Sequence, residues 1–344
     1  MRVFVTGGAG YIGSVMTRVL LEDGHDVTVF DNLSQGHRAA LPRGCRFQRG
    51  SLSDAVQLRR ALRRAGPDCV MHFAASIQVG ESVAHPGRYF ENNVVNGVNL
   101  LNAIVEYGIP RLVFSSSAAV YGAPRRVPIP ESAPLNPANP YGSTKRVFEL
   151  LLEEYAKATK LSCVSLRYFN VVGAYKGAGE DHRPETHIVP LILKAAMAGH
   201  RPPAADRRVF EIYGDDFPTP DGTCIRDYVH VHDLCRAHLL AIKPPATIRK
   251  PMKPETLKPR HQVYNLGSQH GFSVKQVFAA ARAVTGKRIP YRVTARRAGD
   301  VPRLVASSAR IRTELGWRPR ITSLEQMLAD AWEWHQANPE GYAD

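Results

Sequence analysis

The first thirteen residues constrain the fold of this chain more than any other stretch. A short β-branched run at residues 3–6 predicts a buried strand, and glycines at positions 7, 8, 10 and 13 follow it directly. Glycines let a backbone approach a pyrophosphate closely, and the N–H groups of a following helix attract the anion. The stretch therefore predicts a dinucleotide cradle, although a glycine turn of this kind can also be purely structural.

Residues 26–31 predict a second strand, which ends on the carboxylate of Asp31. Its distance from Gly13 is close to the spacing of about 20 residues expected for an acid that binds an adenosine ribose. The same negative charge would repel a 2′-phosphate, so we expect NAD rather than NADP. His37 and Arg38 lie nearby and weaken that preference.

Length and composition are those of an ordinary globular protein. With 344 residues, 44% of them hydrophobic and 22% charged, the chain can bury one large core or two unequal ones. No apolar run is long enough to cross a membrane and no signal-peptide pattern opens the chain, so we expect a cytoplasmic location. Five scattered cysteines without a Cys-x-x-Cys pair indicate reduced thiols and no metal site.

The formal net charge of +14 does not point to a nucleic-acid or membrane partner. Its arginines are spread through predicted helices and are not interleaved with aromatic residues, which indicates a solvated face. Anionic small molecules would gain some attraction from this charge.

Strands and helices alternate along the first half of the chain. This order predicts an α/β fold with a Rossmann-like doubly wound parallel sheet, followed by a smaller and irregular α/β lobe. We expect a nucleotide-binding domain at 1–171, with return elements near 226–242 and 263–285, and a substrate lobe at 172–344. A basic, proline-rich loop is expected at 243–260. Further strands are expected at 46–52, 68–75, 111–117, 161–170 and 263–266, and helices at 53–65, 91–107, 188–198, 231–242, 273–285 and 324–334.

Tyr141 and Lys145 open a helix after a proline-rich approach and lie four residues apart, so they share one helix face. An ammonium beside a phenol favours the phenolate, which would bring the pKa of the tyrosine, ordinarily about 10, closer to neutral pH. A surface tyrosine beside a solvated lysine is the ordinary alternative. Three serines, 115–117, end the preceding strand at the same predicted sheet edge and favour the catalytic interpretation.

These motifs, taken in order, resemble the extended short-chain dehydrogenase/reductase family, and within it the UDP-glucose 4-epimerases, also called UDP-galactose 4-epimerases. The resemblance runs over the whole chain, interrupted mainly at 243–260. Its most specific parts are at 7–13, 31–34, 79–83, 115–122, 167–170 and 226–231.

The resemblance implies an isomerase that interconverts UDP-galactose and UDP-glucose through a 4-keto intermediate, with a permanently bound NAD. It implies that Tyr141 takes the proton of the sugar 4-hydroxyl, that Ser117 binds that oxygen, and that Lys145 lowers the pKa of the tyrosine. It also implies a homodimer, for which the helices at 91–107 and 145–157 are candidates.

Binding residues are carried over in two sets. The resemblance implies cofactor contacts by Gly7, Gly10, Tyr11, Ile12, Gly13, Asp31, Asn32, Ser34, Ser51, Leu52, Phe73, Ala74, Ala75, Asn92, Ser115, Tyr141, Lys145 and Phe169. It implies substrate contacts by Ser117, Tyr141, Asn170, His187, Ile188, Tyr213, Arg226, Arg297, Asp300 and Leu304.

Some positions depart from the family pattern. Ser51 replaces an acid expected near the adenine, Ile77 replaces a lysine near the cofactor, and His187 replaces an asparagine. Leu304 matches a position that gates the sugar pocket, where a bulky residue favours glucose and galactose over their N-acetylated forms.

Other functions stay open at this point. One is the 4-epimerisation of another UDP-sugar, such as an N-acetylated sugar, a glucuronate or a pentose. A 4,6-dehydratase is disfavoured, because Ala118 and Ala119 stand where an Asp-Glu pair is expected. A non-catalytic NAD-binding sensor is the third.

Overall fold

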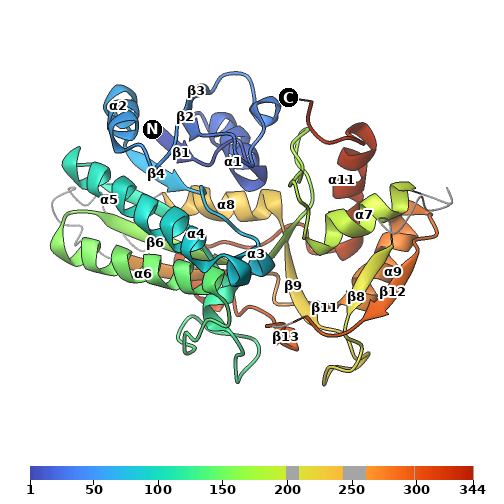
Figure 1. The fold of residues 1–344 in the computed structure, drawn as a ribbon. Helices are drawn as coiled ribbons and strands as arrows, with labels where there is room; N and C mark the ends of the chain where they lie inside the picture. Colours follow the sequence, from blue (N-terminus) through green and yellow to red (C-terminus); the bar gives the residue numbers. More distant parts are fainter. Residues whose placement is uncertain (199–208, 243–260, 298, 344) are drawn as a thin grey trace.

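A seven-stranded parallel sheet forms the framework of the computed structural model, which describes residues 1–198, 209–242, 261–297 and 299–343 (Figure 1). The basic loop expected at 243–260 lies outside the described residues. Across the sheet the strands are β10 (His261–Leu266), β6 (Ser162–Tyr168), β5 (Arg111–Ser117), β4 (Cys69–His72), β1 (Arg2–Thr6), β2 (Asp26–Asp31) and β3 (Arg46–Arg49).

Helices cover both faces of this sheet. Side chains alternate along a strand, so Val3 and Val5 of β1 pack with one layer of helices while Phe4 packs with the other. The first layer contains α1 (Tyr11–Glu22), α8 (Val231–Ala241) and α10 (Ala309–Leu315). The second contains α2 (Ala55–Ala65), α5 (Asn96–Glu106) and α6 (Pro140–Ala158). The expected doubly wound α/β fold is confirmed.

Local sequence signals explain where the main helices begin. The Asp54 side chain accepts the backbone N–H of Gln57 at 2.9 Å and caps α2. Asn139 caps α6 in the same way through Gly142 N–H, also at 2.9 Å, and Pro140 occupies the first turn, where its missing N–H costs nothing. The cap fixes Tyr141 in the first turn of α6, at the carboxyl edge of the sheet.

The remaining described elements form two smaller groups of strands with their own helices. A four-stranded group contains β7 (Asn170–Val172), β9 (Ile225–His230), β11 (Gly271–Ser273) and β13 (Arg303–Leu304), and a two-stranded group contains β8 (Phe210–Tyr213) and β12 (Tyr291–Thr294). The helices packed with them are α7 (Ile188–Ala198), α9 (Val274–Thr285) and α11 (Leu324–Ala337). Short helical turns are α3 (Val79–Ala84), α4 (Pro86–Phe90), η1 (Arg38–Ala40), η2 (Glu91–Val95) and η3 (Ala118–Tyr121).

Several expected elements differ in their bounds. The strands expected at 46–52 and 68–75 are shorter, at Arg46–Arg49 and Cys69–His72. The strand expected at 161–170 ends at Tyr168, and Asn170 begins β7, which pairs with β9 in the other sheet. The helix expected at 91–107 begins as the π-helical turn η2 and becomes α-helical only at Asn96. Alternating hydrophobicity cannot reveal that a chain passes from one sheet to another, because both strands are buried.

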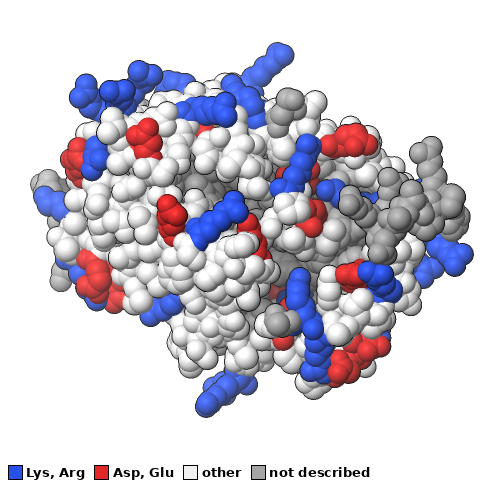
Figure 2. All heavy atoms as spheres, in the orientation of Figure 1, with Lys and Arg blue, Asp and Glu red and all other residues white. Residues whose placement is uncertain are grey.

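Within the part of the chain that the structure describes, no helix combines the length and the apolar composition needed to cross a membrane. Lysine and arginine side chains are scattered over the face shown in Figure 2 and do not gather into one patch.

Candidate active site

The glycine turn packs directly against the end of β4. Gly7 has a φ of +72°, and a Cβ there would lie 2.4 Å from the backbone nitrogen of Ala74. A Cβ on Gly13 would lie 2.2 Å from the carbonyl oxygen of Gly7. Both contacts are with backbone, which cannot move aside as a flexible side chain can. The turn therefore excludes side chains at these two positions.

The turn also leaves the start of α1 open. Gly10 is its N-cap and offers no side-chain hydrogen bond to the first turn. A Cβ on Gly10 would meet only the Gly7 carbonyl oxygen, at 3.5 Å. The N–H groups at the start of the helix, on Tyr11, Ile12 and Gly13, are thus uncapped by a side chain and suited to bind an anion.

Asp31 ties the end of β2 to this turn. Its carboxylate accepts the N–H of Ala9 at 2.9 Å and that of Leu33 at 2.8 Å, and the residue is 8% exposed. Burial raises the pKa of Asp31, and the two backbone hydrogen bonds oppose that rise. Asn32 accepts the N–H of Ser34 at 3.0 Å. These residues lie beside the glycine turn, as the sequence predicts.

Other predicted cofactor residues surround the same sheet edge. Ser51 and Leu52 follow β3, where the Ser51 hydroxyl bonds that of Ser53 at 2.8 Å. Asn92, in η2, donates to Ser76 Oγ at 3.0 Å. Phe73, Ala74 and Ala75 follow β4, and Phe169 follows β6 within a buried cluster.

Ser117 and Tyr141 meet at the end of β5. Ser117 Oγ accepts the N–H of Ala119 at 3.1 Å, so its own proton remains available to another oxygen. A side-chain hydrogen bond joins Ser117 and Tyr141, and it lowers the pKa of the phenol. Burial is the larger effect, and the pKa of Tyr141 is raised overall. Lys145 is not among the groups that shift this pKa, so the role that the resemblance implies for it stays a prediction.

Lys145 is held by a different neighbour. Its Nζ donates to the carbonyl of Ser115 at 2.8 Å and lies 5.8 Å from the centre of the Tyr141 ring. The residue is 3% exposed, and burial lowers the pKa of Lys145 to about 7, against an opposing effect of Glu149.

A buried ionic network lies under this site, and our sequence analysis missed it. Glu149 accepts two hydrogen bonds from Arg167, at 2.9 and 2.7 Å, and one from Ser116 at 2.6 Å. Arg167 also donates to the Tyr121 hydroxyl at 2.8 Å. The network holds β5, β6 and α6 together. The signal available was spacing, because Glu149 follows Lys145 by the same four residues that separate Lys145 from Tyr141.

Five predicted substrate residues come together around β9 and β13. Arg226 donates to the carbonyl of Val301 at 2.8 Å, and its Nη2 lies 3.7 Å from Asp300 Oδ1. Arg297 donates to the same Asp300 oxygen at 3.2 Å. Its guanidinium lies 5.3 Å from the centre of the Tyr213 ring, and Leu304 pairs with Arg226 across the strands.

The other three predicted substrate residues lie elsewhere. Asn170 opens β7 and lies opposite Tyr228 of β9. His187 and Ile188 stand at the start of α7. His187 Nδ1 contacts Glu185 at 2.9 Å and Glu180 at 3.1 Å. No contact in the described chain joins His187 to Arg226, Arg297 or Asp300.

The fold and this site define a class of protein: a Rossmann-type α/β enzyme with a nucleotide cradle beside a Ser-Tyr-Lys set. The comparisons with known proteins agree and go further. The model of the NAD dependent epimerase/dehydratase family matches residues 3–267, and the chain belongs to that family.

Three of the similar proteins are UDP-glucose 4-epimerases. A UDP-glucose 4-epimerase of Corynebacterium glutamicum is 47% identical, over 98% of this chain and 96% of its own. A crystal structure of a UDP-glucose 4-epimerase has a TM-score of 0.90 at 42% identity, with 99% of each chain covered. The enzyme from Bifidobacterium longum, in complex with NAD+ and UDP, has a TM-score of 0.88 at 34% identity, again with 99% of both chains covered. The resemblance inferred from the sequence is confirmed.

Proposed function

We propose that this chain is an isomerase that interconverts UDP-galactose and UDP-glucose with NAD as its cofactor. The relatives named UDP-glucose 4-epimerase, at up to 47% identity over nearly the whole chain, support this activity. Related enzymes in complex with NAD, among them that of Brucella ovis, support the cofactor. In this proposal residues 1–171, with return elements near 226–242 and 263–285, bind NAD, and the lobe at 172–344 binds the UDP-sugar.

The residues at the glycine turn fit NAD. Side chains are excluded at Gly7 and Gly13, and the start of α1 has no side-chain cap, so a pyrophosphate can approach the backbone. Asp31 stands beside the turn and can accept hydrogen bonds from the adenosine ribose. When bound, NAD supplies an acceptor for the hydride of sugar C4 and returns that hydride to the other face.

Two side chains would move the proton and orient the sugar. Tyr141 takes the proton of the 4-hydroxyl as the hydride leaves, and gives it back when the 4-keto sugar is reduced. The Ser117 hydroxyl, which is hydrogen-bonded to Tyr141, would donate a hydrogen bond to the reacting oxygen when the sugar is bound. Because burial raises the pKa of Tyr141 in the free chain, we expect the phenol to lose its proton only with both ligands bound.

The residues around β9 would bind the UDP-sugar. Asp300 lies between Arg226 and Arg297 and holds two guanidinium groups on one side of the site. Planar guanidinium groups bind phosphate oxygens through paired hydrogen bonds, which suits a diphosphate. Tyr213, next to Arg297, would pack on the uracil.

The observation that carries this proposal is the meeting of Ser117 and Tyr141 at the sheet edge that also holds the glycine turn. The test is to incubate the purified protein with UDP-galactose without added NAD. We expect UDP-glucose at equilibrium, because the cofactor copurifies. A stoichiometric oxidised sugar would instead indicate a dehydrogenase, and no reaction even with added NAD would favour a sensor.

We further propose that the chain forms a homodimer through α5 and α6. Tyr155 of α6 donates to Asn102 of α5 at 2.6 Å, and the two helices lie side by side in Figure 1. Val95, just before α5, is 58% exposed, and Leu150 of α6 is 42% exposed. Light scattering should give twice the chain mass, and Leu150→Glu should shift the equilibrium toward the monomer.

A further inference from the structure

Two glutamates and two histidines gather in the segment between β7 and α7. One ligand atom from each of Glu180, His182, Glu185 and His187 lies within 4.8 Å of all the others. The cluster contains none of the Ser-Tyr-Lys residues, and only His187 is among the predicted substrate residues.

The spacing of these atoms suits a tetrahedral ion. Ligand atoms about 2.0–2.1 Å from a zinc ion lie about 3.3 Å from one another. His182 Nδ1 is 3.3 Å from Glu180 Oε1 and 3.7 Å from Glu185 Oε2. His187 Nδ1 is 3.1 Å from the same Glu180 oxygen. These three distances between ligand atoms are therefore close to those that a tetrahedral zinc site requires.

Two atoms of the cluster are buried without a hydrogen bond. They are His182 Nδ1 and Glu185 Oε2, and the Glu185 side chain is only 4% exposed. The other oxygen of Glu185 accepts the N–H groups of Thr186 and His187, each at 2.7 Å, which fixes the carboxylate plane. Buried polar atoms normally have hydrogen-bond partners. A fixed carboxylate oxygen and an imidazole nitrogen that lie 3.7 Å apart without a hydrogen bond therefore indicate a ligand between them.

The cluster joins two carboxylates to two imidazoles in a mostly buried place. The side chains of Glu180 and Glu185 are 9% and 4% exposed. A dication bound between them would replace the protons of the imidazole nitrogens and balance both carboxylate charges.

We infer that Glu180, His182, Glu185 and His187 bind one divalent transition-metal cation, and that Zn²⁺ fits best. Imidazole nitrogen and carboxylate oxygen are ordinary zinc ligands, and four protein ligands make a structural site. Cysteine spacing could not reveal such a site, but the order Glu-Asp-His at 180–182 and Glu-Thr-His at 185–187 is a signal that sequence reasoning missed.

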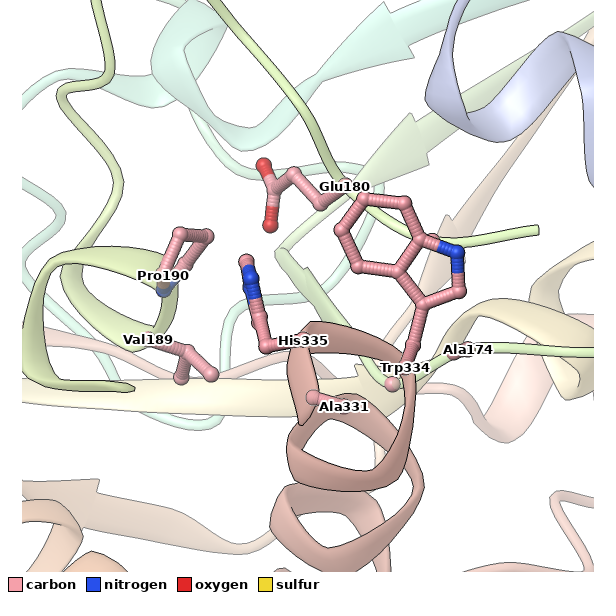
Figure 3. A pocket seen from close by; sticks show the side chains of 9 residues that line it. Ala174, Glu180, Val189, Pro190, Ala331, Trp334 and His335 are labelled. Atoms are coloured by element: carbon pink, nitrogen blue, oxygen red, sulfur yellow. The ribbon is translucent and has the colours of Figure 1, made fainter. Parts of the chain in front are cut away.

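The position of the cluster suggests what the ion would do. Figure 3 shows the Glu180 carboxylate entering a pocket formed by α7 and α11, near Pro190 and His335. His187 comes directly before α7. An ion here would fasten the segment at 180–187 to the start of α7 and stabilise this part of the chain.

The test is metal content of the untagged chain. The protein is equilibrated with Zn²⁺ alone, dialysed against metal-free buffer and analysed by mass spectrometry for metals. We expect about one zinc per chain in the parent protein, at least tenfold less in His182→Ala and Glu185→Gln, and a melting temperature that falls when a chelator is added. His25→Ala is the matched control, because His25 contacts one carboxylate, Asp23 at 3.1 Å, outside any such cluster.

A zinc content in the parent that equals that of both variants would overturn the inference, as would loss of zinc in His25→Ala alone. If the variants do not fold, Co²⁺ titration of the parent protein decides. Intense visible absorption bands from a tetrahedral ion support the site, and only the weak bands of hydrated Co²⁺ contradict it. These readouts do not depend on epimerase activity, so they remain valid if the proposed function fails.

Discussion

The nucleotide half and the sugar half of the site are built in different ways. Around the glycine turn, the contacts are made by backbone: Gly7 against Ala74, Gly13 against Gly7, and Asp31 with two N–H groups. Around β9, the contacts are made by long side chains, with Asp300 between Arg226 and Arg297. The first half is built around one contiguous stretch, residues 7–13, whereas the second joins residues from separate strands and loops.

The Ser-Tyr-Lys set connects the two halves, and its loss should have the largest effect. Tyr141→Phe removes the proposed general base, so we expect kcat to fall about 10²- to 10⁴-fold with bound NAD unchanged. Tyr155→Phe is the control, because it removes a hydroxyl that lies on the same helix and donates a hydrogen bond to Asn102. Initial rates with UDP-galactose provide the measurement, and equal rates for the two variants would contradict the role of Tyr141.

Arg226→Ala tests the sugar half of the site, which is built from long side chains. Hydrogen bonds to charged groups are each worth about 1.5–3 kcal/mol, so we expect KM for UDP-galactose to rise about 10- to 100-fold. Bound NAD should not change, because Arg226 contacts Val301 and Asp300. Isothermal titration with UDP checks the binding directly. If NAD were lost instead, the division between the two halves would be wrong.

Gly13→Ala tests the nucleotide half of the site, which is built from backbone contacts. The added methyl would lie 2.2 Å from the Gly7 oxygen, so the turn must shift. Overpacking of this kind costs about 1–3 kcal/mol. We expect a lower free energy of unfolding and loss of copurified NAD. Gly87→Ala, where a Cβ meets nothing within 4 Å, should change neither, and matched behaviour of the two variants would refute the cradle.

The pKa of Lys145 predicts a dependence of stability on pH. Burial lowers this pKa from 10.5 to about 7, so between these values the unfolded chain binds more protons than the folded one. The free energy of unfolding of the NAD-free protein should therefore rise with pH from about 7 to about 10.5, relative to Lys145→Met, by up to about 1.4 kcal/mol per pH unit. Below pH 7 the difference should be constant. Urea titrations that give a flat difference would contradict this assignment.

Leu304→Ala should have the smallest effect. Leu304 pairs with Arg226 and packs near a buried cluster that includes Phe169. A smaller side chain should admit an N-acetyl group, and a change of a few methylenes in an apolar pocket is worth about 10- to 200-fold at most. The ratio of kcat/KM for UDP-N-acetylgalactosamine to that for UDP-galactose should rise about tenfold. An unchanged ratio would show that Leu304 does not limit the size of the sugar pocket.

The nucleotide half of the site could be predicted from the sequence better than the sugar half. The strand at 26–31, the strand at 111–117 and the helix at 188–198 have the bounds that periodicity predicts. The glycine turn and its tie to Asp31 are local, and spacing predicts them well.

What sequence could not predict depends on burial and on distant contacts. The raised pKa of Tyr141 results from its surroundings in the folded chain. The pairing of Glu149 with Arg167 joins a helix to a strand, and Asn170 changes sheet within two residues. Arg226, Arg297 and Asp300 were placed by the family resemblance, because no local pattern distinguishes them from surface charges.

The most direct test of the central claim is to follow the hydrogen of sugar C4. UDP-galactose deuterated at C4 is converted in ordinary water, and the product is analysed by mass spectrometry and proton NMR. If Tyr141 moves only the hydroxyl proton while the hydride stays within the site, all deuterium should appear at C4 of UDP-glucose. Deuterium lost to water would contradict the account, since it would mean that C4 exchanges its hydrogen as a proton.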